Sequence, residues 1–76
     1  MSIEERELYL YTTDHYEKDL SKISKDCVAP LIEVRQVVKK AINQYNYDYC
    51  PKGENCFSEE NFQNVSKAIY NDIMNK

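Results

Sequence analysis

Three cysteines and one histidine are the side chains of this sequence that could together bind a metal ion. They are His15, Cys27, Cys50 and Cys56, a Cys₃His set of the kind that zinc accepts. Structural zinc sites usually place paired cysteines roughly two to four residues apart, whereas five residues separate Cys50 from Cys56. Cys27 falls on an apolar helical stripe, where a free thiol packs as a small apolar residue. The spacing therefore favours core or turn cysteines, and we expect neither a metal site nor a cofactor.

Cys50 and Cys56 could instead form a redox pair, because they flank a Pro-Lys-Gly turn and a disulfide across it is geometrically feasible. The odd number of cysteines favours reduced thiols in a cytosolic protein. A reactive thiol needs a helix start or a cationic neighbour, and Cys56 does precede a predicted helix. Acidic residues oppose this effect: Glu54, Glu59 and Glu60. The sequence favours an incidental pair, with a zinc- or redox-dependent regulator as an alternative.

Catalysis finds little support in the residue pattern. His15 is the single histidine, and its neighbour Asp14 points to another side of a helix. No nucleophile-base-acid arrangement, glycine-rich phosphate loop or H-E-x-x-H motif is present. We therefore expect a protein that is not an enzyme.

Direct binding to nucleic acid is not expected either. The net charge is −3, and the basic residues Arg35, Lys39 and Lys40 make only a small patch. A helix-turn-helix reading would bring Glu59 and Glu60 against the phosphates.

Tyrosine is unusually frequent, with seven in 76 residues. Its ring offers a large contact area at low cost in conformational entropy, and its hydroxyl adds a polar tip, so it is enriched at recognition surfaces. A small bundle has difficulty burying every tyrosine and every apolar residue outside its core stripes. We expect a partner-binding patch made of Leu8, Tyr11, Ile32, Tyr45, Tyr47 and Tyr49. The alternative, that a long first helix covers these residues within the monomer, stays open.

Three helices, at approximately 3–25, 30–46 and 58–75, are predicted to position these residues. The first begins with a capping box formed by Ser2 and Glu5. Its expected buried stripe recurs at steps of three and four: Tyr9, Thr13, Tyr16, Leu20, Ile23 and Cys27. Residues 7–13 also alternate like a strand, but no second strand is visible to pair with them.

The second and third helices carry clearer signals. Pro30 suits a first helical turn, and one face of the second helix is apolar: Leu31, Val34, Val37, Val38, Ala41, Ile42 and Tyr45. Ser58 is a predicted N-cap, and Phe57 with Phe62 fits a hydrophobic staple. The second helix is expected to fray from Asn46 onward. The whole pattern predicts one all-α domain over residues 1–76, a compact three-helix bundle with a long N-terminal helix.

Composition narrows the class of protein further. Apolar residues make up 42% and charged residues 30%, which is typical of a globular chain. The acidic start is unlike a signal peptide and no apolar run could span a membrane, so we expect a cytoplasmic protein. Abundant Lys, Asn, Ile and Tyr indicate an AT-rich gene of the kind that phages, viruses and low-GC bacteria carry.

The Y-x-Y-C-P stretch at 47–51, before a capped helix, resembles the Tyr-Tyr-Pro segment of bacteriocin DNase immunity proteins. The rest of that pattern is missing, so we identify no family. The function predicted from the sequence is a small protein-binding protein that inhibits a host factor for a phage or mobile element. Its partner would be that host factor or a second copy of the chain as a homodimer. A structural subunit of a larger assembly is a further alternative.

Overall fold

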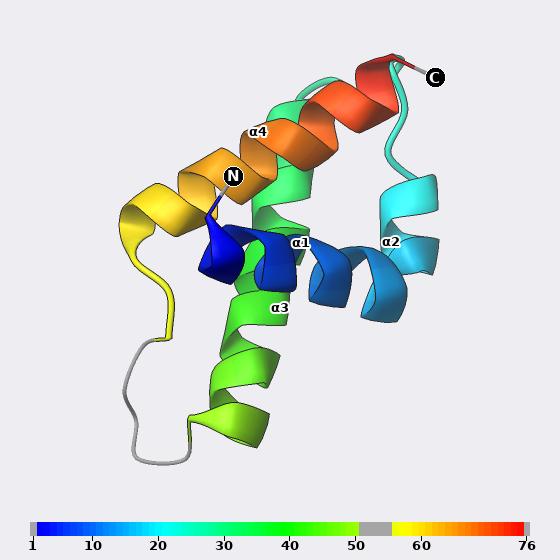
Figure 1. Ribbon diagram of the computed structural model, residues 1–76. Helices are drawn as coiled ribbons and strands as arrows, with labels where there is room; N and C mark the ends of the chain where they lie inside the picture. The colour runs from blue at the N-terminus through cyan, green and yellow to red at the C-terminus, as the bar shows by residue number, and fades with distance from the viewer. Residues whose placement is uncertain (1, 51–55, 76) are drawn as a thin grey trace.

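The structure, a computed structural model, describes residues 2–50 and 56–75, and every regular element in those two stretches is an α-helix. The helices are α1 (Ile3–His15), α2 (Glu17–Ser21), α3 (Pro30–Tyr49) and α4 (Glu59–Met74). α1 and α4 cross the same side of α3 (Figure 1). The radius of gyration of 12.0 Å is close to the value of about 11 Å expected for a compact chain of this length. The predicted all-α fold is confirmed.

The long N-terminal helix predicted over 3–25 is divided in two at Tyr16, so the count of three helices was approximate. Side chains near the end of α1 compete for its backbone carbonyls. The Thr12 hydroxyl donates to the Leu8 carbonyl oxygen at 2.7 Å, and the Thr13 hydroxyl donates to that of Leu10 at 3.2 Å. Such back-bonding bends helices. The chain turns at this point, and α2 leaves the axis of α1 (Figure 1).

α3 is longer than predicted, because it continues through Tyr49 where fraying from Asn46 was expected. Contacts one turn apart support the added residues. Gln44 Nε2 donates to Asp48 Oδ2 at 3.1 Å, and the rings of Tyr45 and Tyr49 lie 4.7 Å apart. Pairs at this spacing stabilise a helix against weak intrinsic propensity. The predicted turn at Pro51–Gly53 and Glu54 lie outside the described residues.

The predicted helix starts at Ser2 and Ser58 are confirmed, and the structure links them to each other. Ser2 and Glu5 form the capping box of α1, and Ser58 and Asn61 form that of α4. The Asn61 side chain accepts from the Ser58 backbone N–H at 3.0 Å through Oδ1, and donates to Glu5 Oε2 at 3.0 Å through Nδ2. Asn64 Nδ2 donates to the same oxygen at 2.9 Å. Polar side chains therefore fasten the start of α1 to the start of α4.

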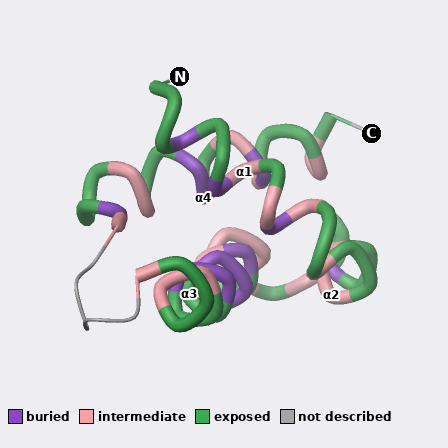
Figure 2. The backbone as a smooth tube through the Cα atoms, turned by 60° about the horizontal axis from the view of Figure 1, so that its bottom comes forward, coloured by how far each residue is buried: buried purple, intermediate pink, exposed green. Residues whose placement is uncertain are grey.

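The core lies between α3 and the two helices that cross it. Seen nearly along its axis, α3 turns its buried residues toward α1 and α4 and its exposed residues outward (Figure 2). The buried apolar residues are Leu8, Ile23, Val34, Val37, Val38, Ala41, Ile42, Phe57, Val65 and Ile69. The predicted apolar face of α3 and the predicted stripe of α4 both supply this core.

The buried line of α1 differs from the predicted one. It runs through Glu5, Leu8 and Thr12, which is rotated by about 100° from a line through Tyr9 and Thr13. Glu5 and Thr12 are polar, and a search for apolar periodicity does not select them. Both side chains are hydrogen-bonded, so burying them does not leave polar groups without partners.

No helix in the described part of the chain is both long enough and apolar enough to cross a bilayer.

Candidate functional site

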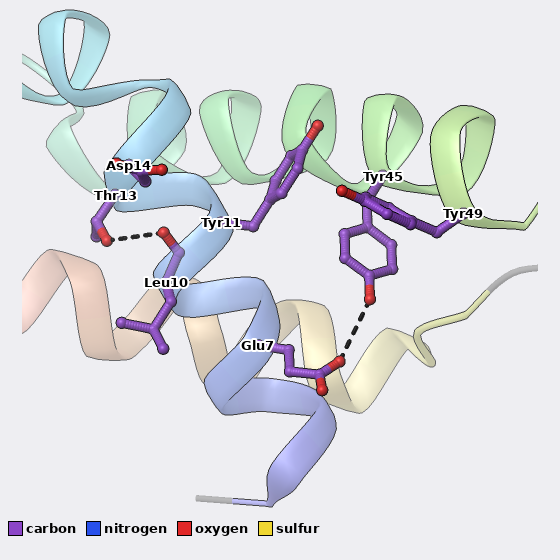
Figure 3. Close-up of a pocket in the computed structure, with 7 residues that line it drawn as sticks. All are labelled: Glu7, Leu10, Tyr11, Thr13, Asp14, Tyr45 and Tyr49. Atoms are coloured by element: carbon purple, nitrogen blue, oxygen red, sulfur yellow. Dashed lines mark hydrogen bonds between the residues drawn. The ribbon is translucent and has the colours of Figure 1, made fainter.

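Three of the predicted partner-binding residues meet in one open groove between α1 and the C-terminal half of α3. The groove has a volume of about 640 Å³. It is lined by Glu7, Leu10, Tyr11, Thr13, Asp14, Tyr45 and Tyr49 (Figure 3). We call it the tyrosine groove. Helical spacing builds it, because Tyr45 and Tyr49 are four residues apart on α3 and Glu7, Leu10 and Asp14 share a face of α1.

Tyr45 is the central ring of this groove. Its centroid lies 5.3 Å from that of Tyr11, 4.7 Å from that of Tyr49 and 5.0 Å from that of the buried Phe57. The Tyr11 and Phe57 contacts are edge-on, a favourable arrangement for aromatic rings. Tyr11 also stacks on His15 at 4.1 Å. The rings of Tyr11 and Tyr45 are thus held in place by neighbours, while Tyr49 remains 65% exposed.

Carboxylates accept hydrogen bonds from two of the tyrosine hydroxyls. Tyr45 Oη donates to Glu7 Oε2 at 3.3 Å (Figure 3), and Tyr11 Oη is 3.5 Å from Asp48 Oδ2. Burial first, and then the nearby carboxylate, raises the pKa of both phenols. Both hydroxyls therefore stay protonated donors at neutral pH. The groove combines aromatic surface with negative charge.

Leu8 was predicted to be part of the binding patch, and this prediction is wrong. Its side chain is 0% exposed and belongs to the core cluster. The cause is the rotation of α1 described above, which turns Leu8 inward and leaves Leu10 56% exposed. Leu10, rather than Leu8, lines the tyrosine groove.

Tyr47 and Ile32 are exposed, as the prediction requires, but they lie outside the tyrosine groove. Tyr47 is 81% exposed and is two residues from both Tyr45 and Tyr49, which places it on another face of α3. Ile32 is 56% exposed near the start of α3, about 20 Å along the axis from Tyr45. The predicted patch is therefore not one continuous surface.

The predicted patch missed four residues that line the groove: Glu7, Leu10, Thr13 and Asp14. Thr13 was assigned to the buried stripe, and Asp14 was considered only beside His15. The signal that could have found Asp14 is its spacing of seven residues from Glu7, which places both carboxylates on one face of a helix.

The candidate metal ligands are not brought together. Cys50 and Cys56 are joined as a disulfide with a Cα–Cα distance of 6.6 Å, and Cys27 is a free thiol. The disulfide that was judged geometrically feasible is present, so the expectation of reduced thiols at Cys50 and Cys56 is not met. Within residues 2–50 and 56–75, no three His, Cys, Asp or Glu side chains converge as metal ligands would.

Two of the three basic residues considered for nucleic-acid binding pack against an aromatic ring. The Arg35 guanidinium lies 5.6 Å and the Lys39 ammonium 5.7 Å from the centroid of Phe62. These contacts join α3 to α4 and give both cations a structural role.

A second groove of about 530 Å³ lies on the other side of α1, against α4. It contains none of the predicted partner-binding residues. Its tyrosine, Tyr9, donates its hydroxyl to Asp72, and this hydrogen bond is the main cause that raises the pKa of Tyr9. The tyrosine groove is the stronger candidate site.

Comparison with known proteins gave no match to a family model, to a curated protein or to a solved structure. The immunity-protein resemblance of the 47–51 stretch therefore gains no support from these comparisons.

Proposed function

We propose that this chain is a small non-enzymatic protein-binding protein of a phage or mobile element, which acts in the host cytosol. In this proposal it inhibits a host factor by covering a basic surface of that factor. The observation that carries the proposal is the tyrosine groove, where Tyr11, Tyr45 and Tyr49 meet beside Glu7 and Asp14.

The composition of the groove supports protein binding over other roles. Tyrosine rings supply contact area with few rotatable bonds, which is typical of protein interfaces. Leu10 and Tyr49 are exposed large side chains at its edge. Negative charge beside these rings favours a basic partner, since complementary potentials steer association and suppress wrong partners.

The engagement of the groove hydroxyls supports a non-enzymatic role. The Thr13 hydroxyl donates to a backbone carbonyl oxygen, and the hydroxyls of Tyr11 and Tyr45 are directed to carboxylates. Burial and the nearby carboxylates raise the pKa of both phenols, so both stay protonated at neutral pH, and a protonated phenol is a poor nucleophile.

The test is capture of a partner from bacterial lysate with the tagged chain and two variants. Tyr49→Ala removes an exposed ring of the groove, and Tyr47→Ala removes an even more exposed ring of the same helix outside it. We expect the wild type and Tyr47→Ala to retain one protein, and Tyr49→Ala to lose most of it. Absence of any partner, or equal capture by both variants, would contradict the proposal.

A redox-dependent regulator is a second candidate, because the disulfide joins Cys50 and Cys56 and each cysteine is next in sequence to a residue that contacts the groove ring Tyr45. Tyr49 and Phe57 are the adjacent residues, and both contact Tyr45. Partner capture in the presence and absence of a thiol reductant tests it. Loss of capture on reduction supports this candidate, and capture that is unchanged argues against it.

A further inference from the structure

The tyrosine groove carries a one-sided charge. Its seven lining residues include two carboxylates, from Glu7 and Asp14, and neither Lys nor Arg. We propose that it holds an arginine-containing segment of the partner, with a guanidinium stacked on Tyr49 and paired with a groove carboxylate. This inference rests on the proposed function and names the chemistry of the partner.

The two carboxylates mark the length of the occupant. Glu7 and Asp14 are seven residues apart on α1, which corresponds to about 10 Å along the helix axis. The Asp14 side chain is 85% exposed, so it is open to a partner. In a peptide with the polyproline II conformation, which has three residues per turn and rises about 3.1 Å per residue, residues three positions apart lie on one face and about 9 Å apart. Two arginines in the pattern Arg-x-x-Arg therefore match both carboxylates.

The rings differ in how much of their surface is open. Tyr11 is stacked on His15 at 4.1 Å, and Tyr45 is surrounded by Tyr11, Tyr49 and Phe57. Tyr49 contacts Tyr45 at a tilt of 42° and keeps most of its surface exposed. Tyr49 is thus the ring on which a planar cation stacks.

Arginine fits this arrangement better than lysine does. Its guanidinium is planar and weakly hydrated, so it stacks on an aromatic ring and pairs with a carboxylate through two N–H groups at once. The lysine ammonium is compact and strongly hydrated, and it gains less from a ring face.

The experiment follows the NMR signals of ¹³C-labelled tyrosine rings while a peptide is added to the chain. Three blocked peptides are compared: Arg-Gly-Gly-Arg, the same peptide with lysine in place of arginine, and the same peptide with citrulline in place of arginine. We expect the arginine peptide to shift the ring signals of Tyr11, Tyr45 and Tyr49 with a millimolar Kd. Its affinity should exceed that of the lysine peptide by about fivefold, and the neutral citrulline peptide should not bind.

Charge-neutralising variants locate the site. Glu7→Gln and Asp14→Asn should each lower the affinity for the arginine peptide by about two- to fivefold. Glu60→Gln, which removes the same charge from an exposed position outside the groove, should leave its affinity unchanged.

Several results would overturn the inference: equal affinity for the arginine and lysine peptides, binding of the neutral citrulline peptide, or an equal loss in Glu60→Gln. Failure here is distinct from failure of the proposed function. A captured partner that Tyr49→Ala loses, combined with no arginine preference, keeps the function and overturns this inference. Selective arginine binding with no partner in any lysate supports the inference and counts against the function.

Discussion

Glu5 is a buried charged residue whose carboxylate is the point where two helix starts meet. Oε1 accepts from the Ser2 backbone N–H at 3.3 Å, and Oε2 accepts from Asn61 and Asn64. The hydrogen bonds from Asn64 and then Asn61 lower the pKa of Glu5 below its ordinary value of 4.5, against the opposing effect of burial. The charged form of Glu5 is therefore the form that stabilises the fold.

Replacement of Glu5 by glutamine should lower the Tm at neutral pH by about 5–10 °C, because an amide offers one acceptor oxygen and turns an N–H₂ group toward other donors. Thermal unfolding followed by circular dichroism measures the loss. Glu4→Gln is the matched control, since Glu4 is exposed in the same first turn. An equal fall in both variants would contradict a specific role for Glu5.

The same residue should make stability depend on acid. A carboxyl whose pKa is lower in the folded than in the unfolded state contributes fully above pH 4.5. That contribution is lost as the pH falls through the folded-state pKa. The Tm difference between wild type and Glu5→Gln should therefore shrink below pH 4.5. A difference that stays constant down to the lowest pH at which the chain folds would argue against this assignment.

At the scale of the helix, the orientation of α1 decides which of two leucines is structural. Leu8→Ala should destabilise the fold by about 2–5 kcal/mol, because it opens a cavity at a fully buried site. Leu10→Ala, in the same helix but at a 56% exposed site, should change stability by no more than about 0.5 kcal/mol. Urea unfolding measures both. Small losses in both variants would mean that α1 presents the face first predicted, because that face contains neither leucine.

The helices differ in how far their sequence determines them. Capping residues and apolar periodicity predicted the starts of α1 and α4 and the buried face of α3, because these signals are local. The rotation of α1 was missed because its buried line includes Glu5 and Thr12, whose partners Asn61 and the Leu8 carbonyl become evident only in three dimensions. The end of α1 was missed because threonine back-bonding acts against a periodicity that continues past it.

The candidate site could be predicted only in part for a similar reason. Abundance of tyrosine pointed correctly to Tyr11, Tyr45 and Tyr49 as neighbours in a surface. The contributions of Glu7 and Asp14 depend on which face of α1 meets α3, and that depends on the burial of Leu8. Because the predicted buried face of α1 was about 100° away from the observed one, the prediction placed Leu8 at the surface and did not select Glu7 or Asp14.

At the scale of the whole molecule, the Cys50–Cys56 disulfide connects the end of α3 to the residues that lead into α4. The two cysteines are six positions apart. Closing a loop of this size lowers the conformational entropy of the unfolded chain and so raises the free energy of unfolding by about 2 kcal/mol. The double variant Cys50→Ser/Cys56→Ser should therefore be less stable than the oxidised wild type by about that amount.

The control is Cys27→Ser, which changes the free thiol and should leave stability nearly unchanged. Alkylation of the unfolded, unreduced chain checks the premise. One modified thiol is expected, whereas three modified thiols would show that the pair is not bonded.

The contact between the two capping boxes has a consequence for how the native chain opens. Helix ends usually fray independently of one another, and each opening costs little free energy. Here Asn61 closes the first turn of α4 and also donates to the carboxylate that closes the first turn of α1. Fraying at either end removes a partner from the other, so these two turns, distant in sequence, form one cooperative unit of local unfolding. Their amide hydrogens then exchange with solvent through a shared opening rather than through two independent ones.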